Sequence, residues 1–215
     1  MEKTELLEQI STLLQKGRMP KVKELVKQAL DEGIDAGEIL EQGLLSGMNV
    51  IGEKFKNNEV FVPEVLIAAR AMNGGMEILK PYLIQAGVET KGTVVIGTIK
   101  GDLHDIGKNL VKMMMEGKGL QVIDLGVDVA PEQYVAAAKE HNANIIACSA
   151  LLTTTMSEMK NVVDLVKADA DLAGKVKVMI GGAPVTQSFC DSIGADAYTP
   201  DAASASDVAL NFCIA

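Results

Sequence analysis

Two side chains capable of metal or acid–base chemistry lie close together in the stretch GDLHDIGKN, residues 101–109. Asp102 precedes His104 by two residues, and His104 is one of only two histidines in the 215-residue chain. An unprotonated imidazole nitrogen binds borderline transition metals, and a carboxylate that accepts a hydrogen bond from the other ring nitrogen fixes the tautomer. The alternative is a local structural role, in which the histidine caps or hydrogen-bonds its own loop.

The elements around this stretch alternate between strands and helices. Five repeats of a β-branched strand followed by an amphipathic helix specify a parallel sheet covered on both faces, of the flavodoxin or Rossmann type. Such sheets bind ligands at the carboxyl ends of their strands, which is where GDLHDIG lies. The expected strands are 93–99, 121–125, 145–149, 176–180 and 197–198, and the expected helices are 106–118, 131–141, 157–168, 186–193 and 204–212.

The first part of the chain has a different period. From residue 4 to about residue 86 the apolar residues recur at helical spacing in four stripes, which predicts a four-helix bundle. Asp35 and Glu38 form the predicted capping box of the third helix, and Pro63 suits the first position of the fourth. The stretch QAGVETKG, residues 85–92, loses the periodicity and is typical of a linker. We therefore expect a helical domain over residues 1–90 and a sheet domain over residues 91–215.

Composition restricts the partners and the compartment. A net charge of −9 and a pI near 4.8 disfavour nucleic acid and anionic membranes as partners. The N-terminus lacks an apolar signal region, and no apolar run is long enough to span a bilayer. Cys148, Cys190 and Cys213 are odd in number and far apart, which is typical of reduced thiols. These features predict a cytoplasmic protein without nucleic-acid or membrane partners.

Two common sites of α/β proteins do not match the end of the first strand. Neither GxGxxG nor GxxxxGK[ST] follows it, so a nicotinamide site and a Walker site are not supported. A response regulator needs acidic residues at the ends of the first and third strands. Asp102 and Asp105 supply part of this set, but the third strand ends in the uncharged pair Cys148–Ser149.

Three motifs in order resemble those of cobalamin-binding domains: DxHxxG, then SxL, then GG. The wider string KGDLHDIGKN is similar to that of methionine synthase and of the small corrinoid proteins of methyltransferase systems. The stretches GMNVIGEKF and FVPEVLIAARAM resemble the helical cap of those proteins, so the resemblance covers nearly the whole chain. It implies a four-helix B12-binding cap followed by a five-stranded, Rossmann-like cobalamin-binding domain. The motif residues are Asp102, His104, Gly107, Ser149, Leu151, Gly181 and Gly182.

The resemblance also implies residue roles. His104 replaces the cofactor's own base as the lower ligand of cobalt, Asp102 orients the imidazole, and the Thr155 hydroxyl extends this relay. Phe61 is implied to cover the upper face of the corrin, although it could equally be a staple residue before the fourth helix. The glycines, taken singly, could be turn residues. The other implied cofactor contacts are Gly101, Leu103, Asp105, Gly107, Ser149, Leu151, Thr153, Gly181, Gly182 and Ala202.

The function implied by the resemblance is that of a methyl carrier that binds cobalamin base-off with histidine on. It is a non-autonomous subunit that accepts a methyl group from a substrate-specific methyltransferase. It donates this group to a second methyltransferase that uses tetrahydrofolate or coenzyme M, and a reductive activase is a further implied partner. The alternative is a cobalamin-binding sensor or storage module. The chain need not record the identity of the methyl donor, because the donor pocket belongs to the partner.

Overall fold

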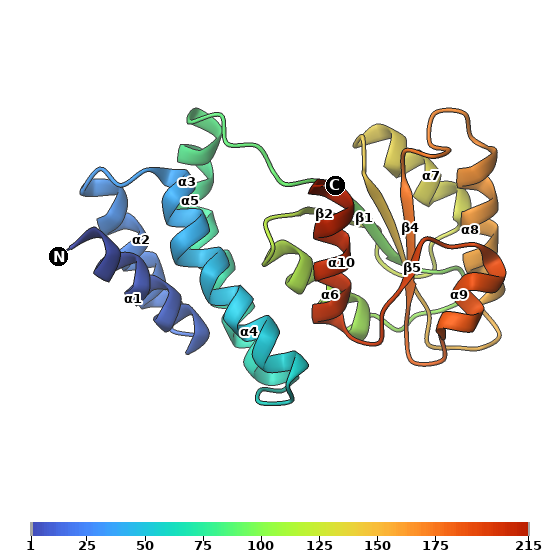
Figure 1. Ribbon diagram of the computed structural model, residues 1–215, viewed down its shortest axis with the longest axis horizontal. Coiled ribbons are helices and arrows are strands. Elements are labelled where there is room, and N and C mark those ends of the chain that lie inside the picture. The colour runs from blue at the N-terminus through green and yellow to red at the C-terminus, as the bar shows by residue number, and fades with distance from the viewer. Residues whose placement is uncertain (1, 215) are drawn as a thin grey trace. The chain divides into compact units, whose positions relative to one another are not determined.

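The computed structural model describes residues 2–214. The chain divides into two compact units, the first comprising the residues up to Thr90 together with Gly117–Gly119, and the second comprising Lys91–Glu116 and the residues from Leu120 onward. The first unit is helical, and the second contains a five-stranded sheet (Figure 1). Within residues 2–214, none of the helices combines the length and apolar character needed to cross a membrane.

The helical unit contains the four predicted helices. The third is continuous but changes character, because a π-helical segment separates two α-helical segments. Apolar side chains that face inward, such as Leu6, Ile10 and Leu44, are fully buried. The elements are α1 (Lys3–Gln15), α2 (Met19–Asp31), α3 (Ala36–Glu38), η1 (Ile39–Leu45), α4 (Ser46–Lys56) and α5 (Val62–Gln85).

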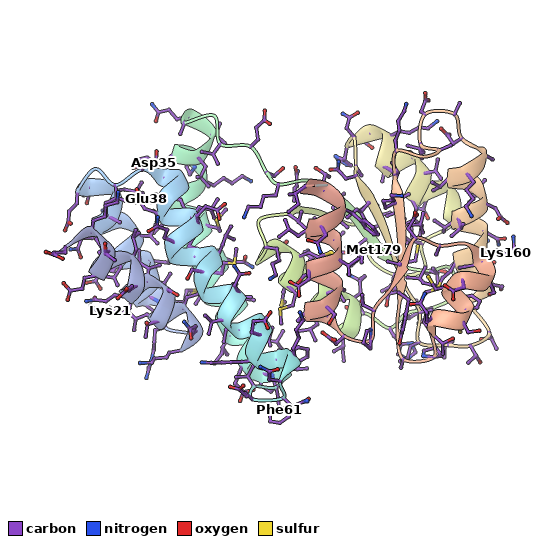
Figure 2. All side chains as sticks on the ribbon, viewed as in Figure 1. Lys21, Asp35, Glu38, Phe61, Lys160 and Met179 are labelled. Atoms are coloured by element: carbon purple, nitrogen blue, oxygen red, sulfur yellow. The ribbon has the colours of Figure 1, made fainter. Side chains whose placement is uncertain are left out.

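The predicted helix starts are close to those observed. Asp35 caps the third helix, because its Oδ1 accepts a hydrogen bond from the Glu38 backbone N–H at 3.1 Å. The Glu38 carboxylate, which a full capping box would turn back to Asp35, instead lies 2.6 Å from Lys3 Nζ. Helix α5 begins at Val62, so Pro63 is its second residue and not its first. Figure 2 labels Asp35 and Glu38 at the start of the third helix.

The second unit is a doubly wound parallel sheet, as predicted. Its strand order is β2-β1-β3-β4-β5, and every pairing is parallel. Helix α10 (Ala202–Ile214) begins two residues before its predicted start at residue 204. The strands are β1 (Thr93–Thr98), β2 (Gln121–Asp124), β3 (Ile145–Ser149), β4 (Lys177–Gly181) and β5 (Ala197–Tyr198). The helices are α6 (Ile106–Glu116), α7 (Pro131–Glu140), α8 (Ser157–Ala168), α9 (Gln187–Ile193) and α10.

Two separate cores lie on the two faces of the sheet. Helices α7, α8 and α9 cover one face, and α6 and α10 lie side by side on the other (Figure 1). Met179 of β4 belongs to the core beneath α10 (Figure 2). The strand order reverses between β1 and β3, where Thr98 pairs with Ser149. The loops that follow these two strands therefore meet at the topological switch point.

A buried ion pair attaches α6 to the end of β2. The Lys108 side chain is only 2 % exposed, and its Nζ lies 2.6 Å from Asp124 Oδ1 and 2.7 Å from Asn109 Oδ1. Burial would raise the pKa of Asp124, but the hydrogen bonds from Lys108 and from the Gly126 N–H, together with the charges of Lys108 and Lys112, outweigh it, so the pKa is lowered. The Asp124 carboxylate therefore stays ionised and balances the buried ammonium group.

We expect Asp124→Asn to destabilise the protein by about 2–4 kcal/mol at pH 7, because Lys108 remains buried without a counter-charge. Urea unfolding measures this difference. The folded pKa of Asp124 is depressed, so its contribution is complete above the unfolded value near 4 and is lost as the pH falls below it. The gap between wild type and variant should therefore narrow below about pH 4.

The matched control is Glu24→Gln, which removes an exposed pair with Lys21 on α2. It should change the unfolding free energy by less than about 0.5 kcal/mol. A wild-type advantage over Asp124→Asn that persisted unchanged at low pH would contradict the assignment of this contribution to the ionised carboxylate.

Candidate functional site

The Asp102 carboxylate joins the loops after β1 and β3. It is fully buried, and its Oδ1 accepts a hydrogen bond from the His104 backbone N–H at 3.0 Å and lies 2.7 Å from His104 Nδ1. Its Oδ2 accepts from the backbone N–H groups of Leu151 at 2.7 Å and Leu152 at 3.1 Å. One side chain therefore fixes the histidine and connects the two loops across the switch point.

These hydrogen bonds also set the proton on the imidazole. Burial would raise the pKa of Asp102, but the donors from Leu151, His104 and Leu152 outweigh it and hold the pKa far below its usual range. An ionised carboxylate has no proton to donate, so in its hydrogen bond with His104 the proton is on Nδ1. When this imidazole is neutral, its lone pair is therefore on Nε2. The His104 side chain is 53 % exposed. Among residues 2–214, Nε2 has no hydrogen-bond partner.

Thr155 lies at the other end of the predicted relay. Its Oγ1 is 3.4 Å from Asp102 Oδ2 and 2.9 Å from the carbonyl oxygen of Leu152. Because a hydroxyl has one proton, the shorter bond to Leu152 is the stronger of the two. The three side chains predicted to act together are thus adjacent, and the contact with Thr155 is the weakest link among them.

Apolar side chains are exposed beside the half-exposed histidine. Leu103 and Ile106 flank His104 in the chain, and Leu151 and Leu152 belong to the loop that Asp102 holds. Large apolar side chains exposed together mark a surface that a ligand or partner covers. Such a surface, with one imidazole nitrogen free, suits a flat ligand that is apolar over much of its area.

The predicted glycines fall into two groups. A Cβ added at Gly107 or Gly181 would meet no atom within 4 Å, so these positions leave open space at the edge of the sheet. Gly101 has φ +84° and Gly182 has φ +130°, conformations that other residues rarely adopt. A Cβ on Gly182 would also overlap the carbonyl oxygen of Ala150. The second pair shapes the backbone, whereas the first pair leaves room for a ligand.

The remaining predicted contacts occupy different environments. Thr153 is exposed and Ser149 is half-buried, and neither hydroxyl has a hydrogen-bond partner in the part of the chain that is described. Asp105 is exposed and accepts a hydrogen bond from Asn109 Nδ2 at 3.1 Å. Ala202 is buried at the first position of α10. The free hydroxyls are therefore available to a ligand, whereas Asp105 and Ala202 already have structural roles.

Phe61 lies in the helical unit, in the turn between α4 and α5 (Figure 2). Its ring is 64 % exposed, and its backbone N–H donates to the Glu64 carboxylate at 3.0 Å. The hydrogen bond fixes the backbone at the start of α5 and leaves the ring uncovered within this unit.

The sequence interpretation missed two residues that hold the histidine loop. Thr98 Oγ1 donates to the carbonyl oxygen of His104 at 2.8 Å, and Asp128 Oδ1 accepts from the Gly101 backbone N–H at 2.7 Å. Thr98 carries a detectable signal, because it is a polar residue directly after the apolar run 94–97 of β1. Asp128 carries no such signal, because no spacing along the sequence links it to the histidine loop. Only the folding of the sheet brings the two together.

The donor set fits a metal that brings most of its own ligands. Within residues 2–214, no three His, Cys, Asp or Glu side chains are grouped closely enough to hold a metal ion. His104 offers one oriented nitrogen ligand, with a carboxylate behind it and apolar side chains beside it. A cobalt ion enclosed in a corrin ring can accept a single nitrogen ligand of this kind from a protein.

We expect Gly182→Ala to destabilise the apo protein by about 2–4 kcal/mol, because a Cβ would force a strained backbone against Ala150. The matched change Gly181→Ala faces open space and should cost less than about 1 kcal/mol. Chemical denaturation of the two variants tests this contrast. Equal stabilities would show that the close approach of the two loops is not a constraint.

Two family models match the chain. Each is described as a B12 binding domain, one matching residues 92–207 and the other residues 6–80. The first covers the sheet unit with Asp102, His104 and the glycine pair. The second covers most of the helical unit.

Similar proteins agree with these matches. The chain is 49 % identical over 177 residues to trimethylamine corrinoid protein 1 of Methanosarcina acetivorans, covering 81 % of this chain and 82 % of that protein. It is 42 % identical to dimethylamine corrinoid protein 1 of the same organism, covering 95 % and 96 %. The structure of the methanol:cobalamin methyltransferase complex MtaBC from Methanosarcina barkeri matches with a TM-score of 0.87 and 32 % identity, covering 97 % of this chain and 80 % of that one. The chain therefore belongs to the B12-binding corrinoid proteins and is similar to those of methylamine and methanol methyltransferase systems.

Proposed function

We propose that this B12-binding protein is a methyl carrier that holds its corrinoid base-off, with His104 as the lower ligand of cobalt. The observation that carries the proposal is the pair Asp102–His104, in which a buried carboxylate holds the Nδ1 proton and leaves Nε2 free. The resemblance to trimethylamine and dimethylamine corrinoid proteins supports the carrier role. When bound, the cobalt supplies the centre that takes up and gives off the methyl group.

The residues of the sheet domain have separate tasks in this proposal. Nε2 of His104 would bind the metal, and Asp102 would strengthen that nitrogen by holding the proton on Nδ1. Thr155 would adjust the relay by donating its hydroxyl either to Asp102 or to the Leu152 carbonyl. Exposed leucines such as Leu103 would exclude water from the face they contact.

The rest of the cofactor needs room and polar contacts. The open space at Gly107 and Gly181 would admit the displaced nucleotide tail, and the free hydroxyls of Ser149 and Thr153 would meet its polar groups. Gly101, Asp105, Leu151, Gly182 and Ala202 would complete the site. Residues 91–215 thus form the proposed cobalamin-binding domain. Residues 1–90 form its proposed cap, and Phe61 would shield the upper face of the corrin.

A carrier requires partners on both sides of the transfer. We propose a substrate-specific methyltransferase as donor, a methyltransferase that uses tetrahydrofolate or coenzyme M as acceptor, and a reductive activase. The structural likeness to a corrinoid protein within a methyltransferase complex supports the first of these. We place the carrier in the cytoplasm, because its three cysteines are free thiols and two of them are buried.

The proposed ligand is tested by the visible spectrum of the protein mixed with hydroxocobalamin. Wild type should give a base-off spectrum with histidine bound, whereas His104→Ala should give a base-off spectrum without it, because Nε2 is lost. Binding of no corrinoid by wild type would refute the site. Enzymatic transfer of the methyl group from methylcobalamin-loaded protein to tetrahydrofolate or coenzyme M separates a carrier from a sensor or storage module, which would not support transfer.

Asp102→Asn should weaken the coordination by His104, because an amide lacks the charge that holds the proton on Nδ1. Loss of such a partner typically lowers metal affinity by about 10–100-fold. Titration with hydroxocobalamin measures the change. The surface variant Asp164→Asn, which removes a partner of Lys160 on α8, is the control and should bind as wild type does (Figure 2 labels Lys160). Unchanged affinity and spectrum in Asp102→Asn would contradict the assigned role.

A further inference from the structure

We propose that Thr98 and Asp128 are positioning residues that hold the loop carrying His104 and so set how well its imidazole binds the corrinoid metal. This inference rests on the proposed function of His104. Asp102 anchors the loop to the end of β3. Thr98 and Asp128 anchor the same loop to β1 and to the segment after β2.

Thr98 acts directly on the histidine backbone. Its side chain is fully buried, and Oγ1 donates to the carbonyl oxygen of His104 at 2.8 Å. The backbone of Thr98 is itself fixed, because its N–H donates to the Gly126 carbonyl at 2.9 Å and its carbonyl accepts from the Val129 N–H at 3.0 Å. The Thr98 hydroxyl is thus held in a fixed position in the strand, and its hydrogen bond fixes the distance between the His104 backbone carbonyl and the end of β1.

Asp128 makes two hydrogen bonds to the backbone just before His104, at residues 101 and 102. Its Oδ1 accepts from the Gly101 N–H at 2.7 Å, and its backbone N–H donates to the Asp102 carbonyl at 3.0 Å. Asp128 has φ +55°, a left-handed conformation that Asp and Asn tolerate better than most residues. The loop after β2 thus offers both a donor and an acceptor to residues 101–102.

Asp102 holds the histidine loop to the loop after β3, whereas Thr98 and Asp128 hold it to β1 and to the loop after β2. If Thr98 or Asp128 lost its contact, Asp102 would still hold the β3 loop through Leu151 and Leu152. The segment 100–104 could then shift relative to β1, and the His104 ring with it. One hydrogen bond is worth about 1 kcal/mol net, which corresponds to an affinity loss of about fivefold for each anchor removed.

The variants form matched pairs. Thr98→Val removes the hydroxyl and keeps the β-branched shape, whereas Thr98→Ser keeps the hydroxyl. Asp128→Ala removes the acceptor, whereas Asp128→Asn keeps an acceptor oxygen and a residue suited to φ +55°. Asn142→Ala is the control for backbone strain, because Asn142 is exposed at φ +48° in the turn after α7.

The first readout uses the apo protein and needs no cofactor. The chain has two histidines, so imidazole ¹⁵N spectra contain only the signals of His104 and of the exposed His141, an internal reference. In wild type the His104 shifts should report a proton held on Nδ1. Thr98→Val and Asp128→Ala should move them toward those of His141, whereas Thr98→Ser, Asp128→Asn and Asn142→Ala should leave them near wild type.

The second readout is titration with hydroxocobalamin. Thr98→Val and Asp128→Ala should each bind about three- to tenfold more weakly, with a smaller histidine-bound fraction in the visible spectrum. In a His104→Ala background the same changes should alter affinity by less than about twofold, because the residue they act through is gone. Thr98→Ser and Asp128→Asn should restore most of the affinity.

Three results would overturn the proposal. The first is an Asp128→Ala protein that matches Asn142→Ala in both readouts. The second is an equal loss of affinity with and without His104, which would mean that the residues act on the fold or on the cofactor directly. The third is unchanged His104 signals in the apo variants. If wild type bound no corrinoid, the proposed function would fail, and the apo spectra would still decide whether Thr98 and Asp128 hold the ring.

Discussion

The buried carboxylate of Asp102 is the constraint on which the site depends. It carries a charge with no solvent contact, and hydrogen bonds from His104, Leu151 and Leu152 compensate that charge. Because these donors come from the loops after β1 and β3, satisfying the charge closes the edge of the sheet at its switch point. The same bonds place the imidazole proton on Nδ1. Stability and ligand chemistry at this edge therefore have one physical cause.

The neighbouring strand and loops supply the other contacts that shape the site. The loop after β2 contributes Asp128, and strand β1 contributes the Thr98 hydroxyl, so the histidine loop is held on both sides. The loop after β4 approaches the end of β3 so closely at Gly182 that only glycine fits, while Gly181 beside it faces open space. Parallel strands end at one edge, so residues far apart in the chain can meet there without further structure.

A site with one proposed protein ligand suits the proposed carrier role. His104 offers a single nitrogen and is half-exposed, and the side chains around it are apolar and accessible. In the proposed function the bound cofactor carries out the methyl transfer, and the protein holds and presents it. In the helical unit, Phe61 is an exposed aromatic residue that does not contribute to the core of that unit, which is compatible with its proposed role as a cover for the corrin.

Much of this protein was predictable from the sequence. The change from a helical to a strand–helix period predicted nearly every element, because burying an apolar face imposes a period on the residues that form it. The motif residues Asp102 and His104 were recognisable because they are neighbours in the chain and act as a pair. The π-helical segment within the third helix was not predictable, since its apolar spacing is still compatible with an α-helix.

Only the tertiary structure decided which groups surround that pair. The Leu151 and Leu152 donors to Asp102 are backbone N–H groups, which every residue except proline has, so no residue type marks them. The contacts of Thr98 and Asp128 with the loop depend on the strand order, which places the ends of β1, β2 and β3 together. The sequence by itself determined the elements and the reactive pair. The packing of the sheet determined how that pair is held, because those contacts join segments that only the fold makes neighbours.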